Sequence, residues 1–96
     1  MSYQLTKKAE EDLISIAEIG IELFGERLAQ FYHNALFDLF EVISANPKMA
    51  RERSELTPPV RVHPFKAHVI IYQVEGDGIS IIRIRHGRED WLSTSE

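Results

Sequence analysis

The sequence contains no cysteine among its 96 residues, which excludes disulfide bonds, a thiolate nucleophile and a Cys-ligated zinc site. No apolar run approaches the ~18 residues that span a bilayer, and the N-terminus leads directly into a charged segment. We therefore expect a soluble, cytoplasmic protein that does not associate with membranes. The GxSxG, HExxH and paired-carboxylate patterns are also missing, so the residues give weak support for an enzyme, and we expect no cofactor or metal.

Basic charge is scarce overall, and its distribution is uneven. The net charge is -4, whereas proteins that wrap nucleic acid are usually strongly basic because they neutralise phosphates. Residues 1–45 carry three basic side chains against eight acidic ones, while residues 46–88 carry eight basic against four acidic. We therefore expect no stable direct binding of nucleic acid, and a local cationic contact patch in the second half of the chain.

The length and composition predict one compact domain that spans residues 1–96. The chain is 44% hydrophobic and 27% charged, which is ordinary for a globular protein, and it has no repeat or low-complexity segment. A chain of this size buries only about 60–65% of the surface that its unfolded form exposes. We therefore expect a modest stability that a bound partner would supplement.

Two amphipathic helices are predicted in the first half of the chain. Thr6 resembles an N-cap, and apolar residues then recur at offsets of three and four from Ala9 to Phe24. Gly25 marks a break, and a second helix with a broad apolar stripe covers residues 26–45. Pro47 ends this second helix because the residue before a proline is disfavoured in the helical region. The two helices are expected to form an antiparallel hairpin.

The second half of the chain predicts strands. Residues 60–63 alternate, and two runs rich in Ile and Val, residues 69–74 and 79–84, flank the turn Glu75-Gly76-Asp77-Gly78. The short segment Tyr3-Gln4-Leu5 predicts an edge strand in the same sheet. The fold class is therefore α+β, with a short N-terminal strand and an antiparallel helical hairpin packed on a small, mainly antiparallel sheet.

Two connections complete this prediction. Residues 48–59 show no clear period and end in two prolines, so they predict an exposed connection with one helical turn at residues 49–52. Residues 64–66 are expected to form the turn between the strand at 60–63 and the long hairpin.

A cluster of cationic side chains at the end of the last strand is the main candidate site. Arg83, Arg85, His86 and Arg88 lie together, and alternation along a strand places Arg83 and Arg85 on one face and His86 on the other, unless a bulge intervenes. With Arg61 from a neighbouring strand, such a group can clamp a phosphate while the imidazole moves a proton. The alternative is a solvated sheet face, which composition favours, whose arginines pair with Glu55, Glu75 or Asp77.

The acidic tail carries two large apolar residues, Trp91 and Leu92. They either pack back on the sheet or contact a partner. Because arginines and large aromatic residues anchor protein interfaces, the segment from Arg88 to Trp91 is a candidate contact surface.

Four further residues are candidates on chemistry alone. Tyr72 is expected to pack on the sheet with its hydroxyl reaching solvent, and His33 is expected to face solvent from its helix. His63 and His68 flank a turn but have no further ligands, so we interpret them as structural or surface histidines.

The order of these elements resembles the ParE toxins of the RelE/ParE superfamily. The resemblance covers nearly the whole chain, from TKKAEEDLISIAEIGIELFG to RVHPFKAHVIIYQVEGDGISIIRIRHGREDW. The specific motifs are HPF, HVIIY, EGDG and R-x-R-H-G-R-x-D. The resemblance implies the toxin of a type II toxin-antitoxin system that inhibits DNA gyrase by binding and has no catalysis of its own. A ParD-like antitoxin is expected to neutralise it in a hetero-oligomer, wrapping the toxin with its C-terminal segment.

For such a toxin we expect a target-binding surface that is formed or supported by the residues clustered at the strand end and tail, namely Arg83, Arg85, His86, Arg88 and Trp91. RelE-type relatives instead cut mRNA on the ribosome, and in that alternative Arg61, Arg83 and His86 would be catalytic. Gly87 follows His86, however, and no tyrosine follows Tyr72, so the proton-transfer residues of that class are incomplete.

Overall fold

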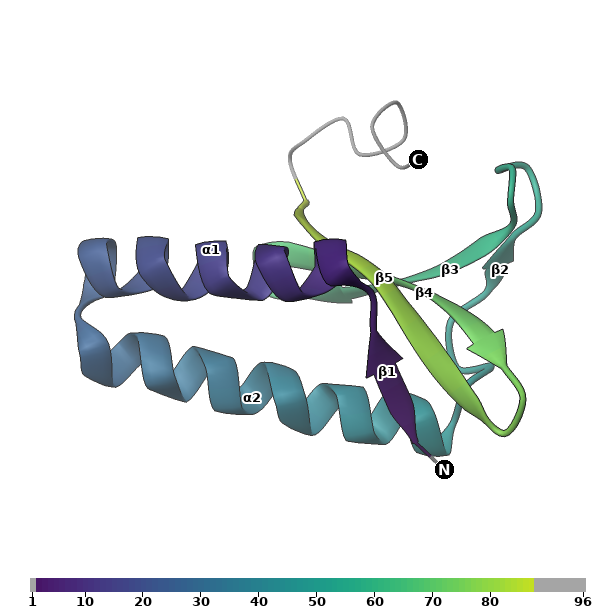
Figure 1. Cartoon of the computed structure of the whole chain (residues 1–96), viewed down its shortest axis with the longest axis horizontal. Helices are drawn as coiled ribbons and strands as arrows, with labels where there is room; N and C mark the ends of the chain where they lie inside the picture. Colours follow the sequence, from purple (N-terminus) through teal and green to yellow (C-terminus); the bar gives the residue numbers. More distant parts are fainter. Residues whose placement is uncertain (1, 88–96) are drawn as a thin grey trace.

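The structure, a computed structural model, describes residues 2–87 as two helices and a five-stranded sheet (Figure 1). This arrangement confirms the predicted α+β class. The elements in chain order are β1 (Tyr3–Leu5), α1 (Lys7–Phe24), α2 (Glu26–Ala45), β2 (Glu52–Arg53), β3 (Val60–Phe65), β4 (His68–Glu75) and β5 (Gly78–His86).

The helical hairpin has the boundaries that the sequence predicts. The Thr6 hydroxyl accepts a hydrogen bond from the Ala9 N–H at 3.1 Å, which confirms the N-cap of α1. Gly25 separates the helices with a φ of 89°, a left-handed conformation that favours glycine. The helices then run side by side in opposite directions (Figure 1). Within residues 2–87, no helix combines the length and apolarity needed to cross a bilayer.

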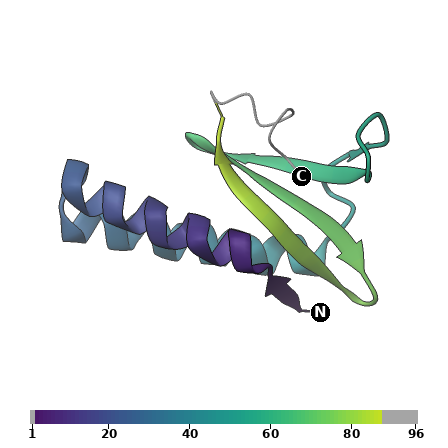
Figure 2. The same cartoon turned by 45° about the horizontal axis from the view of Figure 1, so that its top comes forward.

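The sheet has the strand order β1-β5-β4-β3-β2. β1 is parallel to β5, and every other neighbouring pair is antiparallel, so the predicted N-terminal strand and the mainly antiparallel sheet are confirmed. Both helices lie on the same side of the sheet (Figure 2). The start of β4 and the end of β5 lie next to each other in the sheet, and both line a groove with residues of α1 and α2.

Two predicted connections were wrong. β3 continues through Pro64, and the turn lies at Lys66 and Ala67, with a φ of 52° at Lys66. Proline is tolerated there because β2 pairs only with the first two residues of β3, which leaves the rest of that edge without a partner strand among the described residues. The predicted helical turn at residues 49–52 is absent, and Glu52–Arg53 form β2 instead.

The core lies between the sheet and the half of the hairpin nearest to β1. Phe40 of α2 is completely buried and meets the ring of Tyr3 edge-on, with centroids 5.4 Å apart. The other members come from both helices, from the connection between α2 and β2, and from β4 and β5: Ala9, Leu13, Leu36, Ile43, Ala50, Ile70, Tyr72, Ile79, Ile81 and Ile84.

Two side chains that were expected to reach solvent are turned inward. Tyr72 is fully buried, and its hydroxyl donates to the Pro47 carbonyl at 2.8 Å, because a buried phenol needs a hydrogen-bond partner. His33 is half-buried, with Nε2 3.2 Å from the Leu13 carbonyl and its ring against Phe37. Both predictions of solvent exposure were therefore wrong.

Candidate functional site

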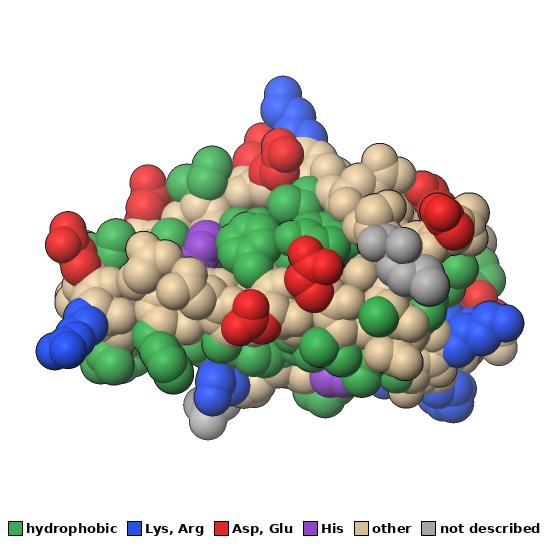
Figure 3. Space-filling view, turned by 90° about the horizontal axis from the view of Figure 1, so that it is seen from below, with side chains coloured by type: hydrophobic (Ala, Val, Ile, Leu, Met, Phe, Trp, Pro, Cys, Tyr) green, Lys and Arg blue, Asp and Glu red, His purple; other side chains and the backbone are tan. Residues whose placement is uncertain are grey.

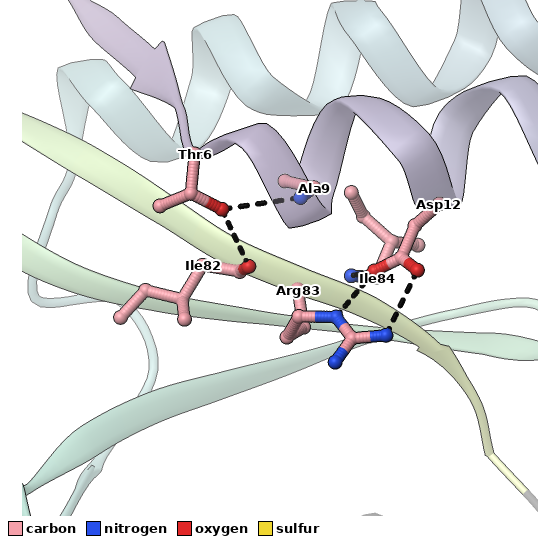
Figure 4. A network of polar contacts seen from close by, with 6 residues as sticks. All are labelled: Thr6, Ala9, Asp12, Ile82, Arg83 and Ile84. Carbon is pink, nitrogen blue, oxygen red and sulfur yellow. Dashed lines mark hydrogen bonds and ion pairs between the residues drawn. The ribbon is translucent and has the colours of Figure 1, made fainter. Parts of the chain in front are cut away.

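Side chains of α1 hold the end of β5. β1 is too short to pair with β5 beyond Ile81, and α1 supplies the next partners along that edge (Figure 4). The Thr6 hydroxyl donates to the Ile82 carbonyl at 2.8 Å, and the Asp12 carboxylate accepts the Ile84 N–H at 3.0 Å. Helix side chains thus take the place of a neighbouring strand, which fixes β5 against α1.

A β-bulge interrupts the alternation of β5 at Ile82. Tyr72 pairs with Ile81, but the preceding Ile71 pairs with Arg83, so Ile82 is the extra residue. Ile81 and Ile84 therefore both reach the core although they are three residues apart. A bulge, which the sequence analysis left open, therefore interrupts the alternation at Ile82, and the residues from Arg83 to His86 alternate again.

Arg83 and Asp12 form a bidentate ion pair. Nε and an Nη of Arg83 lie 2.7 and 3.0 Å from the two Asp12 oxygens, and both side chains are only 16% exposed (Figure 4). Arg83 thus pairs with Asp12 of α1. It does not pair with Glu55, Glu75 or Asp77, which were the partners considered from the sequence. Because its charge is compensated internally, Arg83 positions the strand end.

A large apolar groove lies beside this strand end. The hairpin extends beyond the sheet (Figures 1 and 2), and its free end, residues 19–31, lacks the cover that the core half receives. The groove, about 820 Å³, lies between this free end, the β3–β4 turn and the end of β5. Its apolar walls include Ile19, Leu23, Phe24, Leu28 and Phe31, all of which are exposed.

The last residues of β5 line the same groove. Arg85 is half-buried and His86 is exposed. The charged residues in the lining are Asp12, Lys66, Arg83 and Arg85, a balance of two positive charges. On the face seen from below, carboxylates lie beside a central group of apolar side chains (Figure 3). The groove therefore combines apolar walls with a cationic end.

A tyrosine and two histidines connect α2 to the strand ends in this groove. The Tyr32 hydroxyl lies 2.6 Å from Nδ1 of His68, whose ring meets that of His86 with centroids 5.5 Å apart. Burial raises the pKa of Tyr32, and the Ala67 backbone opposes this shift. Tyr32 therefore keeps its phenolic proton at neutral pH, and the tautomer of His68 sets the direction of this hydrogen bond.

The structure does not bring Arg61 to the other candidate residues. Arg61 lies opposite Tyr72 and donates to the Ala50 carbonyl at 2.6 Å, whereas His86 lies opposite His68. Tyr72 and His68 are four residues apart on β4, which is roughly 13 Å along a strand. Among the residues that the structure describes, the proposed nuclease set of Arg61, Arg83 and His86 is therefore not assembled.

Other predicted features can be placed only in part. Arg88 and Trp91 lie outside the described residues. His63 is half-buried, with Nδ1 2.7 Å from the Pro64 carbonyl, and takes no part in the groove. In residues 2–87, no three His, Asp or Glu side chains are grouped closely enough to hold a metal ion.

Sequence reasoning missed the roles of Asp12, Tyr32 and His68. Asp12 had been interpreted only as an acidic residue that complements the helix dipole. Its spacing from Ile16 and Ile19 places it on the apolar side of α1, and a carboxylate in that position is a signal for a buried partner. Nothing in the local sequence indicates that Tyr32 and His68 meet, because 36 residues separate them.

Comparison with known proteins identifies the family. A model described as the ParE toxin of the type II toxin-antitoxin system, parDE, matches residues 3–91. The chain belongs to the ParE toxin family. This finding confirms the resemblance seen in the sequence, and it makes the chain a ParE-type toxin.

Individual relatives agree with this assignment. Toxin ParE3 of Caulobacter vibrioides is 30% identical over 83 residues, which cover 86% of this chain and 83% of the relative. Toxin ParE1 of Mycobacterium tuberculosis is 29% identical over 89 residues, which cover 92% of this chain and 91% of the relative. A solved structure described as the chromosomal ParDE TA system from P. aeruginosa superposes with a TM-score of 0.76 at 26% identity, covering 90% of this chain and 95% of that one.

Proposed function

We propose that this ParE-type toxin inhibits DNA gyrase by binding and that a ParD-like antitoxin neutralises it in a hetero-oligomer. The observation that carries the proposal is a wide apolar groove that ends in cationic residues, a surface suited to binding protein. The relatives named as ParE toxins and the ParDE neighbour support the pairing with an antitoxin.

The target-binding surface is proposed at the end of β5 and the residues that follow it. Arg85 and His86 line the groove at this end, and Arg88 and Trp91 follow them in the sequence. Arg83 contributes indirectly, since its ion pair with α1 sets the course of the strand. Arginine and aromatic side chains at a fixed strand end are typical anchors of protein interfaces.

The antitoxin is proposed to cover the free end of the hairpin. Phe31 is 70% exposed and Leu23 and Phe24 are each 65% exposed, which is unusual for side chains grouped on one surface. The edge of β3 beyond Arg61 is a second candidate contact, because a partner strand can add there. A partner on these surfaces would remove apolar area from water and raise the stability of the toxin.

The test is a supercoiling assay with purified gyrase. We expect the wild-type chain to inhibit supercoiling, and R85A and H86A to need at least about tenfold more protein for half-inhibition, because the loss of one interface anchor costs ~2 kcal/mol or more. R53A is the matched control, since Arg53 lies on β2 and pairs with exposed Glu55. A folded wild-type chain that leaves supercoiling unchanged would contradict the proposal.

Ribosome-dependent mRNA cleavage is a second candidate function. The observation that favours it is the contact of Tyr32, His68 and His86 beside Arg85, which places a phenol, two imidazoles and a guanidinium in one groove. In this case translating ribosomes would show cleaved message with the wild-type chain, and H86A would abolish cleavage. The apolar walls and the net charge of -4 favour the gyrase proposal.

A further inference from the structure

Two histidine rings meet where β4 begins and β5 ends. His68 and His86 are directly opposite each other in the register of these antiparallel strands. In the next pair along the strands, the Gly87 N–H donates to the Ala67 carbonyl at 2.8 Å. Hydrogen-bonded and non-hydrogen-bonded pairs alternate along an antiparallel ladder, so His68 and His86 form a non-hydrogen-bonded pair, in which opposite side chains are closest. The strand register therefore holds the two imidazoles within reach of each other.

The separation of the two rings fits a shared metal ion. Their centroids are 5.5 Å apart, and their planes are inclined by 69°. Two imidazoles that bind one tetrahedral ion, each through a nitrogen about 2.0–2.1 Å from the metal, have centroids roughly 5 Å apart. A small rotation of the exposed His86 side chain closes this difference.

Tyr32 supplies the contact that orients one of these rings as a ligand. Its hydroxyl lies 2.6 Å from Nδ1 of His68, so Nε2 is the nitrogen that would bind an ion. In metal sites, the second ring nitrogen of a histidine ligand almost always forms a hydrogen bond that fixes the tautomer. Burial raises the pKa of Tyr32, so the phenol keeps its proton and serves as the oxygen partner of Nδ1, not as a ligand.

We propose that His68 and His86 together bind one divalent transition-metal ion of the Zn²⁺ and Cu²⁺ class, through one ring nitrogen each. Imidazole nitrogen suits both ions. Water supplies the remaining ligands, since His86 is exposed at the end of the groove. A bound ion would link the ends of β4 and β5 and stabilise the folded chain. This inference goes beyond the proposed function, because it concerns a ligand of the toxin itself and does not depend on gyrase.

The surroundings limit the affinity of this site. Two protein ligands are fewer than the three or four of established zinc sites. Lys66 and Arg85 line the same groove, and their positive charges oppose the binding of a cation. The Lys66 ammonium lies 5.8 Å from the centroid of the Phe65 ring, and strand alternation places Arg85 on the face of β5 opposite to His86. We therefore expect an ion that binds reversibly and more weakly than a structural zinc.

The four histidines of the chain provide matched variants for a test. Isothermal titration of the untagged full chain with Zn²⁺ measures stoichiometry and affinity, and H68A, H86A and Y32F are compared with H63A. The control H63A removes a histidine of β3 that does not line the groove. Circular dichroism checks that each variant is folded. Electron paramagnetic resonance of the wild type with Cu²⁺ counts the nitrogen ligands without any substitution.

We expect one Zn²⁺ per wild-type chain and at least a tenfold loss of affinity in H68A and H86A. Y32F should bind about tenfold more weakly because it loses the oxygen that orients His68, and H63A should change less than twofold. Cu²⁺ should bind more tightly than Zn²⁺, with two imidazole nitrogens in its spectrum.

Three results would overturn the inference: no binding by the wild type, an unchanged affinity in H86A, or equal losses in H63A and H86A. The spectrum provides an independent check if H68A does not fold. A single imidazole nitrogen on Cu²⁺ would then overturn the shared site, whatever the variants show.

Discussion

The two ends of the helical hairpin differ in their surroundings far more than in their composition. At the end near β1, Phe40 and Leu36 are completely buried against the sheet. At the free end, residues of the same kind stay in contact with solvent, as Phe31 and Leu28 show. The apolar stripe of α2 runs through both ends, so burial depends on where the sheet stops.

The lengths of the elements explain this difference. With 18 and 20 residues, α1 and α2 extend roughly 27 and 30 Å at 1.5 Å per residue. The sheet lies under only part of that length (Figures 1 and 2). One continuous apolar pattern thus supplies the core at one end of the helix and an exposed apolar surface at the other.

The largest expected effect is a difference in unfolding free energy between a variant at the packed end and a variant at the free end of the hairpin. F40A should lower the free energy of unfolding by about 3–5 kcal/mol, because it leaves a cavity in the packed half. F31A should change it by less than ~0.5 kcal/mol, because that ring is already exposed. Urea unfolding of both variants measures the difference. Equal losses would show that the free end is packed as tightly as the core.

Asp12 lies at the boundary between the two ends. D12A removes the partner of the Arg83 guanidinium and of the Ile84 N–H, so we expect a loss of about 2–3 kcal/mol in unfolding free energy. D12N should lose less, because its amide oxygen can still accept a hydrogen bond. E18A is the control, since Glu18 is exposed on the same helix. Similar urea midpoints for D12A and E18A would refute this role of Asp12.

A substitution at Gly78 measures how much the packing of β1 against β5 contributes to the stability of the packed end. A Cβ at this position would overlap the carbonyl oxygen of Ser2, which accepts the N–H of Ile79. G78A should therefore displace β1 and cost about 1–3 kcal/mol in thermal or urea unfolding, as overpacking does. D77A, in the same turn but exposed, is the matched control. A fully stable G78A would show that β1 contributes little to the packed end.

The smallest expected effect concerns pH. Burial raises the pKa of all three tyrosines, two in the packed half and Tyr32 in the groove. The folded state then keeps phenolic protons that the unfolded state releases near pH 10, so stability should fall as the pH rises above about 10. Absorbance titration of tyrosinate, with parallel urea unfolding at each pH, measures this. Ionisation of all three tyrosines near pH 10 in the folded state would contradict it.

Most of the fold could be predicted from local sequence. The boundaries of α2 match the predicted residues, and Thr6 and Gly25 mark the ends of α1 as expected. The turn at Glu75-Gly76-Asp77-Gly78 also lies where glycine and aspartate predicted it. β2 was missed because two residues are too few to show a period, and they form a strand only by pairing with β3.

Less of the candidate site could be predicted. The sequence located the cationic cluster and placed Arg83 and Arg85 together on one face of the strand, with His86 on the other. The ion pair to Asp12 distinguishes Arg83 from the other two, and this contact depends on helix and strand meeting in space. Arg61 was grouped with them for its chemistry, although strand register places it opposite Tyr72, four residues along β4 from the position opposite His86.

The sequence by itself determined the secondary structure and the resemblance to the ParE family, because helix periods, caps and turns depend on residues a few positions apart. The tertiary structure decided which apolar residues are buried and which line a groove. It also decided that Asp12 and Arg83, separated by 71 positions, form an ion pair. Such contacts depend on the length of each helix relative to the sheet and on strand register, and neither is encoded by any single segment of the chain.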